Sequence, residues 1–379
     1  MYIAHTKEIL QEYGAKLDAA SVVQNTLLPI AIAMQHNTLY CLTRDGRHVE
    51  DLTRDYAAEL NVQPGDVRTV AFKTLLHSVG TGMFRNEIER MMLSAAFDEF
   101  RILHPEEESQ DPYFQNIVIP DAELDGFSLG HVSFKAGEFD MYDASKNENP
   151  YSMYGIPRIG VWNKDFQCPS ASKDGSVWMT VTPSETNTMR EHIRAARGNV
   201  LVLGLGLGYF AYMAHRKPDV SSVTIVEIDP SAIGLFQQHI LPQFDHPEKI
   251  SIIQADAVAY TASLEDGLFD TLFADIWKDV LDTGPYLSIK SASRHLEKTA
   301  VSCWIEEGMM QTIKGTLSMV LMDSMGLPVP EYAKDKLYRY LYKLTARTRI
   351  QTPEDMRELF TTGYLQQLIK TRTSVTWHG

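Results

Sequence analysis

VLVLGLGLGYFAYMA, residues 200–214, is the stretch that decides the fold predicted from this sequence. An apolar run comes first, Gly204, Gly206 and Gly208 follow at alternate positions, and a helix-like segment comes after them. Where a parallel strand leads into a helix, backbone amides point outward, and small residues let a ligand approach them closely. The dinucleotide pattern G-x-G-x-x-G would place its third glycine where Tyr209 stands, which disfavours NAD. The turn therefore predicts a nucleoside-type ligand other than a dinucleotide.

Beyond residue 198 the pattern alternates between strand-like and helix-like segments. Strands separated by helix-length connections imply right-handed crossovers and a largely parallel, doubly wound α/β sheet whose two faces are both buried. The strand-like segments are residues 199–204, 222–228, 249–255, 269–277 and 299–306. The helix-like segments between the first four are residues 208–216, 230–241 and 256–264.

Three acidic residues stand at the ends of these predicted strands, on the edge where ligands of such sheets bind. Glu227 closes the second strand, where a carboxylate can accept both hydroxyls of a ribose. Asp256 follows the third strand and could accept from an adenine amino group, and Asp275 ends the fourth. Taken alone, each acid is explained as well by a helix cap or a solvated loop charge as by a contact with a ligand. Their combination with the glycine turn is what predicts the nucleoside-type ligand.

Over residues 182–325 these features resemble the class I S-adenosylmethionine-dependent methyltransferases, and within them the spermidine synthase-like branch. VEID (residues 226–229) is similar to the ribose-binding stretch of that branch, and FDTLFADIW (residues 269–277) is similar to its fourth-strand motif. The resemblance implies a Rossmann-like methyltransferase sheet and S-adenosylmethionine, or its decarboxylated form, as cofactor. The cofactor-binding residues that it implies are Gly204, Leu205, Gly206, Gly208, Glu227, Ile228, Asp256, Ala257 and Asp275.

Transfer from a sulfonium is an in-line displacement, so the protein supplies alignment, exclusion of water and a place for the departing proton. Asp275 is the first candidate for orienting or deprotonating the acceptor, and Asp279 shares its loop. Trp277 could shape the acceptor pocket, although packing explains a large aromatic after a strand equally well. Glu185, just ahead of the cofactor domain, is a second candidate for binding the acceptor and has a sufficient local role in capping its helix. No metal site is predicted, because His192 has no second ligand at a useful spacing.

The predicted function is methyl transfer from S-adenosylmethionine to a small-molecule acceptor. An aminopropyltransferase that uses decarboxylated S-adenosylmethionine is the alternative within the same resemblance. The chain departs from polyamine synthases in having TPSET (residues 182–186) in place of their tyrosine-glutamine-glutamate stretch and DIWKD (residues 275–279) in place of their serine-rich segment. A third hypothesis is a module that binds an adenosyl ligand without catalysis. Hydrolase and P-loop motifs, G-x-S-x-G and G-x-x-x-x-G-K-[ST], do not occur.

The length of 379 residues predicts several structural units. We expect a helical N-terminal unit (residues 1–112), a small β-rich connecting region (113–181), the S-adenosylmethionine-binding domain (182–327) and a helical C-terminal extension (328–379). Apolar residues at helical spacing predict a helix over residues 84–103, followed by a solvated loop over 104–112. A capping box, with Glu185 three residues after Thr182, predicts the start of another helix.

The net charge and the cysteine content limit the binding partners and the cellular compartment that the sequence predicts. Lys and Arg total 35 against 49 Asp and Glu, a formal charge of −14 that disfavours nucleic acid in the absence of a basic patch. We find no secretory signal and no apolar run long enough to cross a membrane. Cys41, Cys168 and Cys303 are odd in number and far apart, which suits a reducing cytoplasm. The predicted partner is therefore a small-molecule acceptor, and a homo-oligomer is left open.

Overall fold

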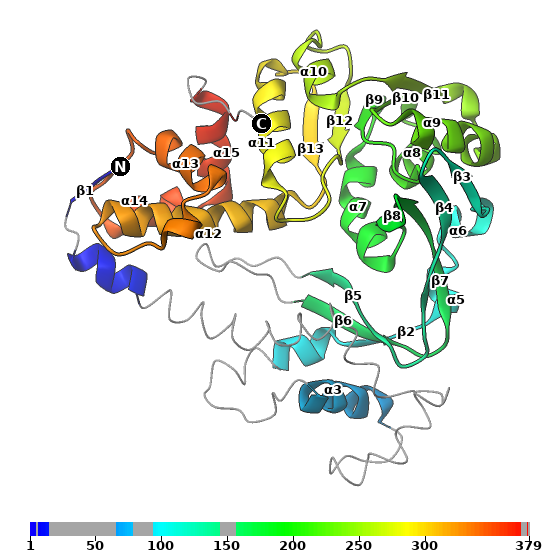
Figure 1. The fold of residues 1–379 in the computed structure, drawn as a ribbon, viewed down its shortest axis with the longest axis horizontal. Coiled ribbons are helices and arrows are strands. Elements are labelled where there is room, and N and C mark those ends of the chain that lie inside the picture. The colour runs from blue at the N-terminus through cyan, green and yellow to red at the C-terminus, as the bar shows by residue number, and fades with distance from the viewer. Residues whose placement is uncertain (5–6, 15–65, 79–93, 145–156, 373–376, 378–379) are drawn as a thin grey trace.

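The computed structural model describes residues 1–4, 7–14, 66–78, 94–144, 157–372 and 377. Its central feature is a five-stranded, wholly parallel sheet in the order β11-β10-β9-β12-β13 (Figure 1). The strands are β9 Gly198–Leu203, β10 Val220–Glu227, β11 Ile250–Gln254, β12 Thr271–Ala274 and β13 Ala300–Cys303. The chain reverses its direction of travel across the sheet beside β9, which places a topological switch point there. The predicted doubly wound, Rossmann-like parallel sheet is thus confirmed.

Helices cover both faces of the sheet, and the side chains of β9 alternate between them. Val200 and Val202 belong to one buried cluster, which includes residues of α8 Tyr209–His215 and α9 Pro230–Leu235. Leu201 and Leu203 belong to the other, which includes residues of α10 Ala257–Ala262 and α11 Thr283–Ala292. α9 continues into a π-helical turn, Phe236–Ile240. Burial of alternate residues on opposite faces is what a period of two within a wholly apolar strand produces.

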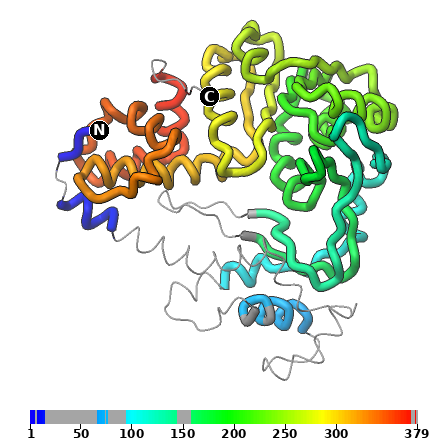
Figure 2. The backbone as a smooth tube through the Cα atoms, in the orientation of Figure 1, coloured from blue at the N-terminus to red at the C-terminus, as the bar shows by residue number. Residues whose placement is uncertain are grey.

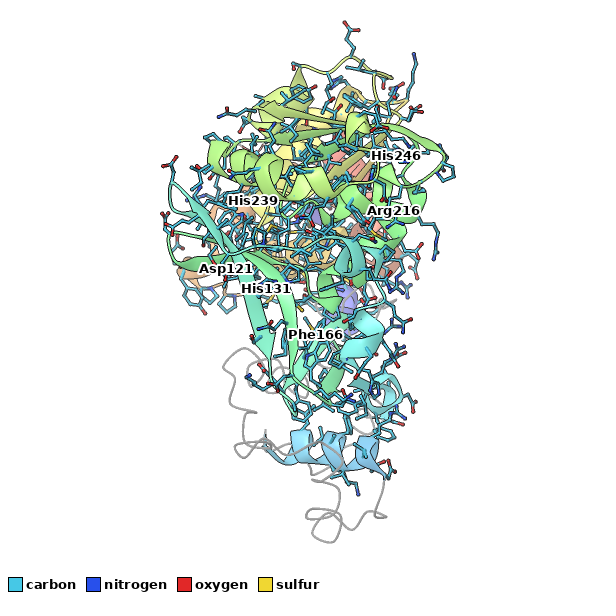
Figure 3. The ribbon with its side chains drawn as sticks, turned by 90° about the vertical axis from the view of Figure 1, so that its right-hand side faces the viewer. Asp121, His131, Phe166, Arg216, His239 and His246 are labelled. Carbon is cyan, nitrogen blue, oxygen red and sulfur yellow. The ribbon has the colours of Figure 1, made fainter. Side chains whose placement is uncertain are left out.

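Two smaller sheets contain strands β2 to β8, of which all but β2 lie within residues 113–181. A four-stranded antiparallel sheet has the order β3-β4-β7-β8, and its strands are Ala122–Leu124, Phe127–Phe134, Phe166–Lys173 and Ser176–Thr180. A three-stranded sheet has the order β2-β6-β5, with strands Arg101–Leu103, Pro157–Trp162 and Phe139–Ala144. Figure 3 views the molecule from the side of the four-stranded sheet, with His131 of β4 and Phe166 of β7 labelled.

The helix predicted from the capping box is confirmed as α7 Pro183–Ala195, which leads from β8 to the central sheet. The Thr182 amide donates to Glu185 Oε2 at 3.1 Å. α7 packs against α8 on one side and β5 on the other. It thus connects the central sheet to the three-stranded sheet.

Two element predictions ahead of residue 113 are wrong. The helix predicted over residues 84–103 is helical at 94–99 in its described part, and residues 101–103 instead form β2, which pairs in parallel with β6. Pairing with a neighbouring strand overrides local helical spacing there. The loop predicted over 104–112 contains α5 Pro105–Glu108 and leads into α6 Pro112–Asn116, each with a proline in its first turn. Residues 15–65, 79–93 and Cys41 of the predicted N-terminal unit lie outside the described residues.

The C-terminal residues share one hydrophobic core with the α10/α11 face of the sheet. The elements are α12 Glu306–Ser324, α13 Lys336–Leu344, β14 Arg349–Ile350, α14 Pro353–Leu359 and α15 Thr362–Thr371. Ile9 and Tyr13 join this core, and β1 Tyr2–Ile3 pairs in parallel with β14. Figure 2 shows this first segment, in blue, beside the orange and red helices. None of the described helices is long and apolar enough to cross a membrane.

Candidate functional site

A cavity of about 590 Å³ lies at the carboxyl edge of the central sheet, where β9, β10, β11 and β12 end. Its walls also include β8, α7 and the first turns of α10 and α11. The predicted cofactor-binding residues that line it are Gly204, Leu205, Gly206, Glu227, Ile228, Asp256, Ala257 and Asp275. The predicted acceptor-binding residues Glu185 and Trp277 line it as well. Gly208 and Asp279 are the two predicted site residues that do not.

The glycine turn is closely packed, and a Cβ would meet a different neighbour at each position. Gly204, at φ +95°, would place a Cβ 1.9 Å from the carbonyl oxygen of Asp275. Gly206 would place one 2.4 Å from Cε of Met179, which packs over the turn from β8. Gly208 begins α8 in the left-handed region, and a Cβ there would meet the ring of Phe236 at 2.4 Å. Gly208 therefore serves packing between α8 and the π-helical turn, whereas Gly204 and Gly206 shape the cavity.

Glu227 ties the ends of β9 and β10 together. Its Oε2 accepts from the Leu205 amide at 3.1 Å, so the carboxylate lies beside the glycine turn. Its Oε1 accepts from the amides of Ile228 and Asp229, both at 2.8 Å. Three hydrogen bonds from backbone amides fix this carboxylate at the wall of the cavity. The Ile228 side chain follows it, with 63% of its surface exposed, and lines the cavity.

Asp256 has the helix-capping role that sequence reasoning left open, and it also lines the cavity. It is the N-cap of α10, and its Oδ1 accepts from the Ala259 amide at 2.7 Å. Ala257 begins the helix next to it. The cap holds the Asp256 carboxylate at the end of β11, one strand further from β9 than Glu227.

Asp275 and Glu185 bring two carboxyl groups into the same cavity. Burial, reinforced by the nearby charge of Glu185, raises the pKa of Asp275 to about 8. Burial also raises the pKa of Glu185 to about 7, against the hydrogen bonds that its carboxylate accepts from the Thr182 amide and, at 3.0 Å, from Thr180 Oγ1. Both groups can therefore hold or release a proton near neutral pH, which is what general acid and base chemistry needs.

The two other candidates, Trp277 and Asp279, lie in the loop after β12, and only Trp277 lines the cavity. Trp277 is 6% exposed and meets the Tyr286 ring edge-on, with centroids 5.9 Å apart, so it packs as well as lining the cavity. Asp279 lies outside the cavity lining, and its Oδ1 accepts from the Leu281 amide at 2.8 Å within the same loop. The structure therefore does not bring Asp279 to Asp275 as a partner in the cavity.

Sequence reasoning missed three further tryptophans of the cavity wall. Four of the five tryptophans in the chain line it, namely Trp178, Trp277, Trp304 and Trp377. Trp304 follows β13 as Trp277 follows β12, and its Nε1 donates to Thr188 Oγ1 at 2.9 Å. Its place near the end of a predicted strand was a usable signal. Trp178 on the exposed edge strand β8 and Trp377 near the end of the chain gave no such signal.

Two cysteines and His192 lie outside this cavity. Burial raises the pKa of the Cys168 and Cys303 thiols, which sit in hydrophobic clusters and form no disulfide. The His192 ring lies 5.3 Å from that of Phe273. No cluster of three or more His, Cys, Asp or Glu that could hold a metal ion occurs among the residues that the structure describes.

Known proteins resemble this chain in structure only. No family model matches the chain, and no curated protein matches it in sequence. A spermidine synthase from Thermotoga maritima matches 38% of this chain and 55% of its own at 15% identity, with a TM-score of 0.30. A spermidine synthase in complex with the transition state analogue AdoDATO matches 38% and 56% at 16% identity (TM-score 0.31). A probable spermidine synthase from Corynebacterium glutamicum matches 40% and 62% at 14% identity (TM-score 0.30). The chain thus spans less than two thirds of each of these proteins.

Proposed function

We propose that this chain is a transferase that moves a methyl group from S-adenosylmethionine to a small-molecule acceptor. The observation that carries the proposal is Asp275, a carboxyl with a pKa of about 8 in the same cavity as the glycine turn. An acid at this position can take a proton from a bound nucleophile near neutral pH.

The residues present fit the adenosyl part of the donor. Glu227 is fixed beside the turn by three backbone amides, which leaves Oε2 of its carboxylate free to accept from one ribose hydroxyl without reorganising. Ile228 offers an exposed apolar side chain next to it, suited to a nucleobase or sugar face. Gly204 and Gly206 of the turn line the cavity and carry no side chains that would keep a ligand from the backbone. Backbone amides and a small-residue turn at a switch point form a recurrent nucleoside site.

When bound, the sulfonium supplies an electrophilic methyl carbon. Asp275 and Glu185 then have two roles, to orient the acceptor for in-line attack and to receive the proton that a hydroxyl or amine loses as its new bond to carbon forms. The carbon–sulfur bond breaks in the same step, and the neutral thioether leaves.

Lys278, in the loop that follows Asp275, also lines the cavity, and it favours the intact donor over the decarboxylated one. A donor that keeps its amino-acid carboxylate offers a partner for an ammonium group. Aminopropyl transfer stays the second candidate, because Asp275 and Glu185 together suit the ammonium end of a decarboxylated donor equally well.

Binding and turnover test the proposal separately. A calorimetric and thermal-shift panel should include S-adenosylmethionine, S-adenosylhomocysteine, decarboxylated S-adenosylmethionine, methylthioadenosine and NAD. We expect the S-adenosyl compounds to bind and to raise the unfolding temperature, and NAD to do neither. Methyl-labelled donor incubated with a metabolite extract should then yield S-adenosylhomocysteine and a labelled product.

The same experiments distinguish the alternatives. Release of methylthioadenosine, with preference for the decarboxylated donor, would replace methyl transfer by aminopropyl transfer. Tight binding without turnover over a broad acceptor panel would favour the non-catalytic module. An Asp275→Asn variant that transfers label at the wild-type rate would remove Asp275 from the chemistry.

A further inference from the structure

The last described residue of the chain, Trp377, lies in the wall of the cavity, although the predicted cofactor domain ends some fifty residues earlier. The indole is held from one side by α13. The Tyr340 ring meets it edge-on with centroids 5.5 Å apart, and Lys336 Nζ lies 4.8 Å from its centroid. α11 and α15 pack against each other, as Figure 1 shows, so α11 and the C-terminal helices form one continuous wall.

Besides α13, Trp377 lies against the first turn of α11. A Cβ placed on Gly284 would lie 3.3 Å from Trp377 Nε1 and 3.4 Å from Cζ2. Gly284 and Pro285 both line the cavity, and the absence of a side chain at 284 lets the indole approach the start of the helix. Trp377 therefore lies against the first turn of α11, at the point where that turn lines the cavity.

Under the proposed function, the nucleobase of the donor lies in this part of the cavity. α10 and α11 pack side by side on the same face of the sheet. Asp256 and Val258, at the start of α10, line the cavity together with Gly284 and Pro285 of α11. Glu227, at the end of the neighbouring strand β10, is the ribose candidate, so the base of the same nucleoside extends from Glu227 toward β11 and α10.

On this basis we infer that Trp377 is a donor-binding residue, which covers the nucleobase of the adenosyl ligand and closes that end of the cavity. The inference rests on the proposed function for the identity of the ligand. It gives the C-terminal extension a role in the site, because α13 positions an aromatic side chain that the α/β domain itself does not supply. Aromatic side chains bind bases through their faces and edges without a need for hydrogen bonds.

Affinities for two probes test this assignment in the full-length protein. S-Adenosylhomocysteine and methylthioadenosine share the adenosine but differ in the rest of the molecule. Trp377→Ala should weaken both to the same extent, by about tenfold, which is the usual size of a lost aromatic–base contact. Trp377→Phe should recover most of the affinity, because it keeps a flat apolar ring. Tyr332→Ala is the matched control, since Tyr332 is an aromatic of the same C-terminal part with 88% of its surface exposed, and we expect no change.

The outcomes separate the inference from the proposal on which it depends. If the wild-type protein binds both probes and Trp377→Ala binds them with the same affinity, only the role of Trp377 is overturned. A loss for S-adenosylhomocysteine but not for methylthioadenosine would also overturn it, because the tryptophan would then contact the amino-acid end. Failure of the wild-type chain to bind either probe would overturn the proposed function and this inference with it. Should Trp377→Ala not fold, a Trp377→Leu variant that binds both probes like wild type would equally refute a requirement for the aromatic ring.

Discussion

Replacing Asp275 by asparagine should make the protein more stable at neutral pH and less stable in acid. The Asp275 carboxyl lies in the cavity beside Glu185, and its backbone carbonyl packs against Gly204. The pKa is about 8 in the folded protein, against 3.8 for an ordinary aspartate. Folding therefore favours the protonated form of this side chain.

The sign and size of the effect follow from linkage. A carboxyl whose pKa rises on folding contributes no penalty below pH 4, where it is protonated in both states, and an increasing penalty as the pH rises toward 8. Each pH unit between the two pKa values corresponds to about 1.4 kcal/mol, so at pH 7 the penalty is about 4 kcal/mol. Asparagine removes this penalty but leaves a buried amide with incomplete hydrogen bonds, at a cost of about 2 kcal/mol. We expect a net gain of about 2 kcal/mol at pH 7 and a net loss of about 2 kcal/mol at pH 4 for Asp275→Asn.

Urea unfolding at half-unit steps from pH 4 to pH 8.5 measures this difference directly. The free energies of unfolding of the wild-type and Asp275→Asn proteins should cross between pH 5 and pH 6 by the same arithmetic, an order-of-magnitude location. Asp279→Asn is the matched control, because that side chain is exposed and caps its own loop. Its curve should run parallel to that of the wild type. A parallel curve for Asp275→Asn would refute the raised pKa and, with it, the reasoning that makes Asp275 a base near pH 7.

Three further predictions address the neighbouring residues. Glu227→Gln should weaken binding of S-adenosylhomocysteine by about tenfold or more in calorimetry, since charged hydrogen-bond acceptors are the stronger ones; unchanged affinity would exclude a ribose contact. Gly204→Ala should lower the free energy of unfolding by about 3 kcal/mol or more. The control Gly175→Ala, also at positive φ but with open space around it, should lower it by only about 1 kcal/mol. Equal losses would mean that the Asp275 carbonyl is not a rigid obstacle. Glu185→Gln should move the acid limb of the pH profile for labelled-methyl transfer to lower pH, because a negative charge that raises the pKa of Asp275 is removed; a shift to higher pH would contradict the pairing of the two groups.

Local periodicity predicted the central sheet because each of its strands is a short apolar run followed by helical spacing. β9 shows why this works, since Val200 to Leu203 are buried on both faces and need no partner information to be recognised as a strand. β2 shows why it fails. The residues 101–103 continue a helical pattern, and only their pairing with β6, some sixty residues later, makes them a strand.

The candidate site was predictable where strand ends determine it. Glu227, Asp256 and Asp275 each follow a recognisable strand, and a parallel sheet brings all such positions to one edge. Asp279 was placed with Asp275 on sequence proximity alone, but at Asp279, five residues beyond the end of β12, the loop has turned and the carboxylate accepts from an amide of its own loop. Trp377 could not be predicted, because its position depends on contacts with α13 and with the first turn of α11, which are distant from it along the chain.

The stability penalty at Asp275 and the proposed chemistry have a common electrostatic origin, which pH-dependent binding can reveal. An acid pair that is protonated because it is buried without a counter-charge will ionise more readily when a cation enters the cavity. By linkage, the affinity for the cationic S-adenosylmethionine should rise with pH between 6 and 8.5, by at most about tenfold per unit for one proton released. S-Adenosylhomocysteine lacks the sulfonium charge, so the ratio of its dissociation constant to that of S-adenosylmethionine should rise over the same range, and Asp275→Asn should flatten that rise. A ratio that stays constant with pH in the wild-type protein would show that the sulfonium does not lie near Asp275, and the methyl-transfer geometry would have to be placed elsewhere in the cavity.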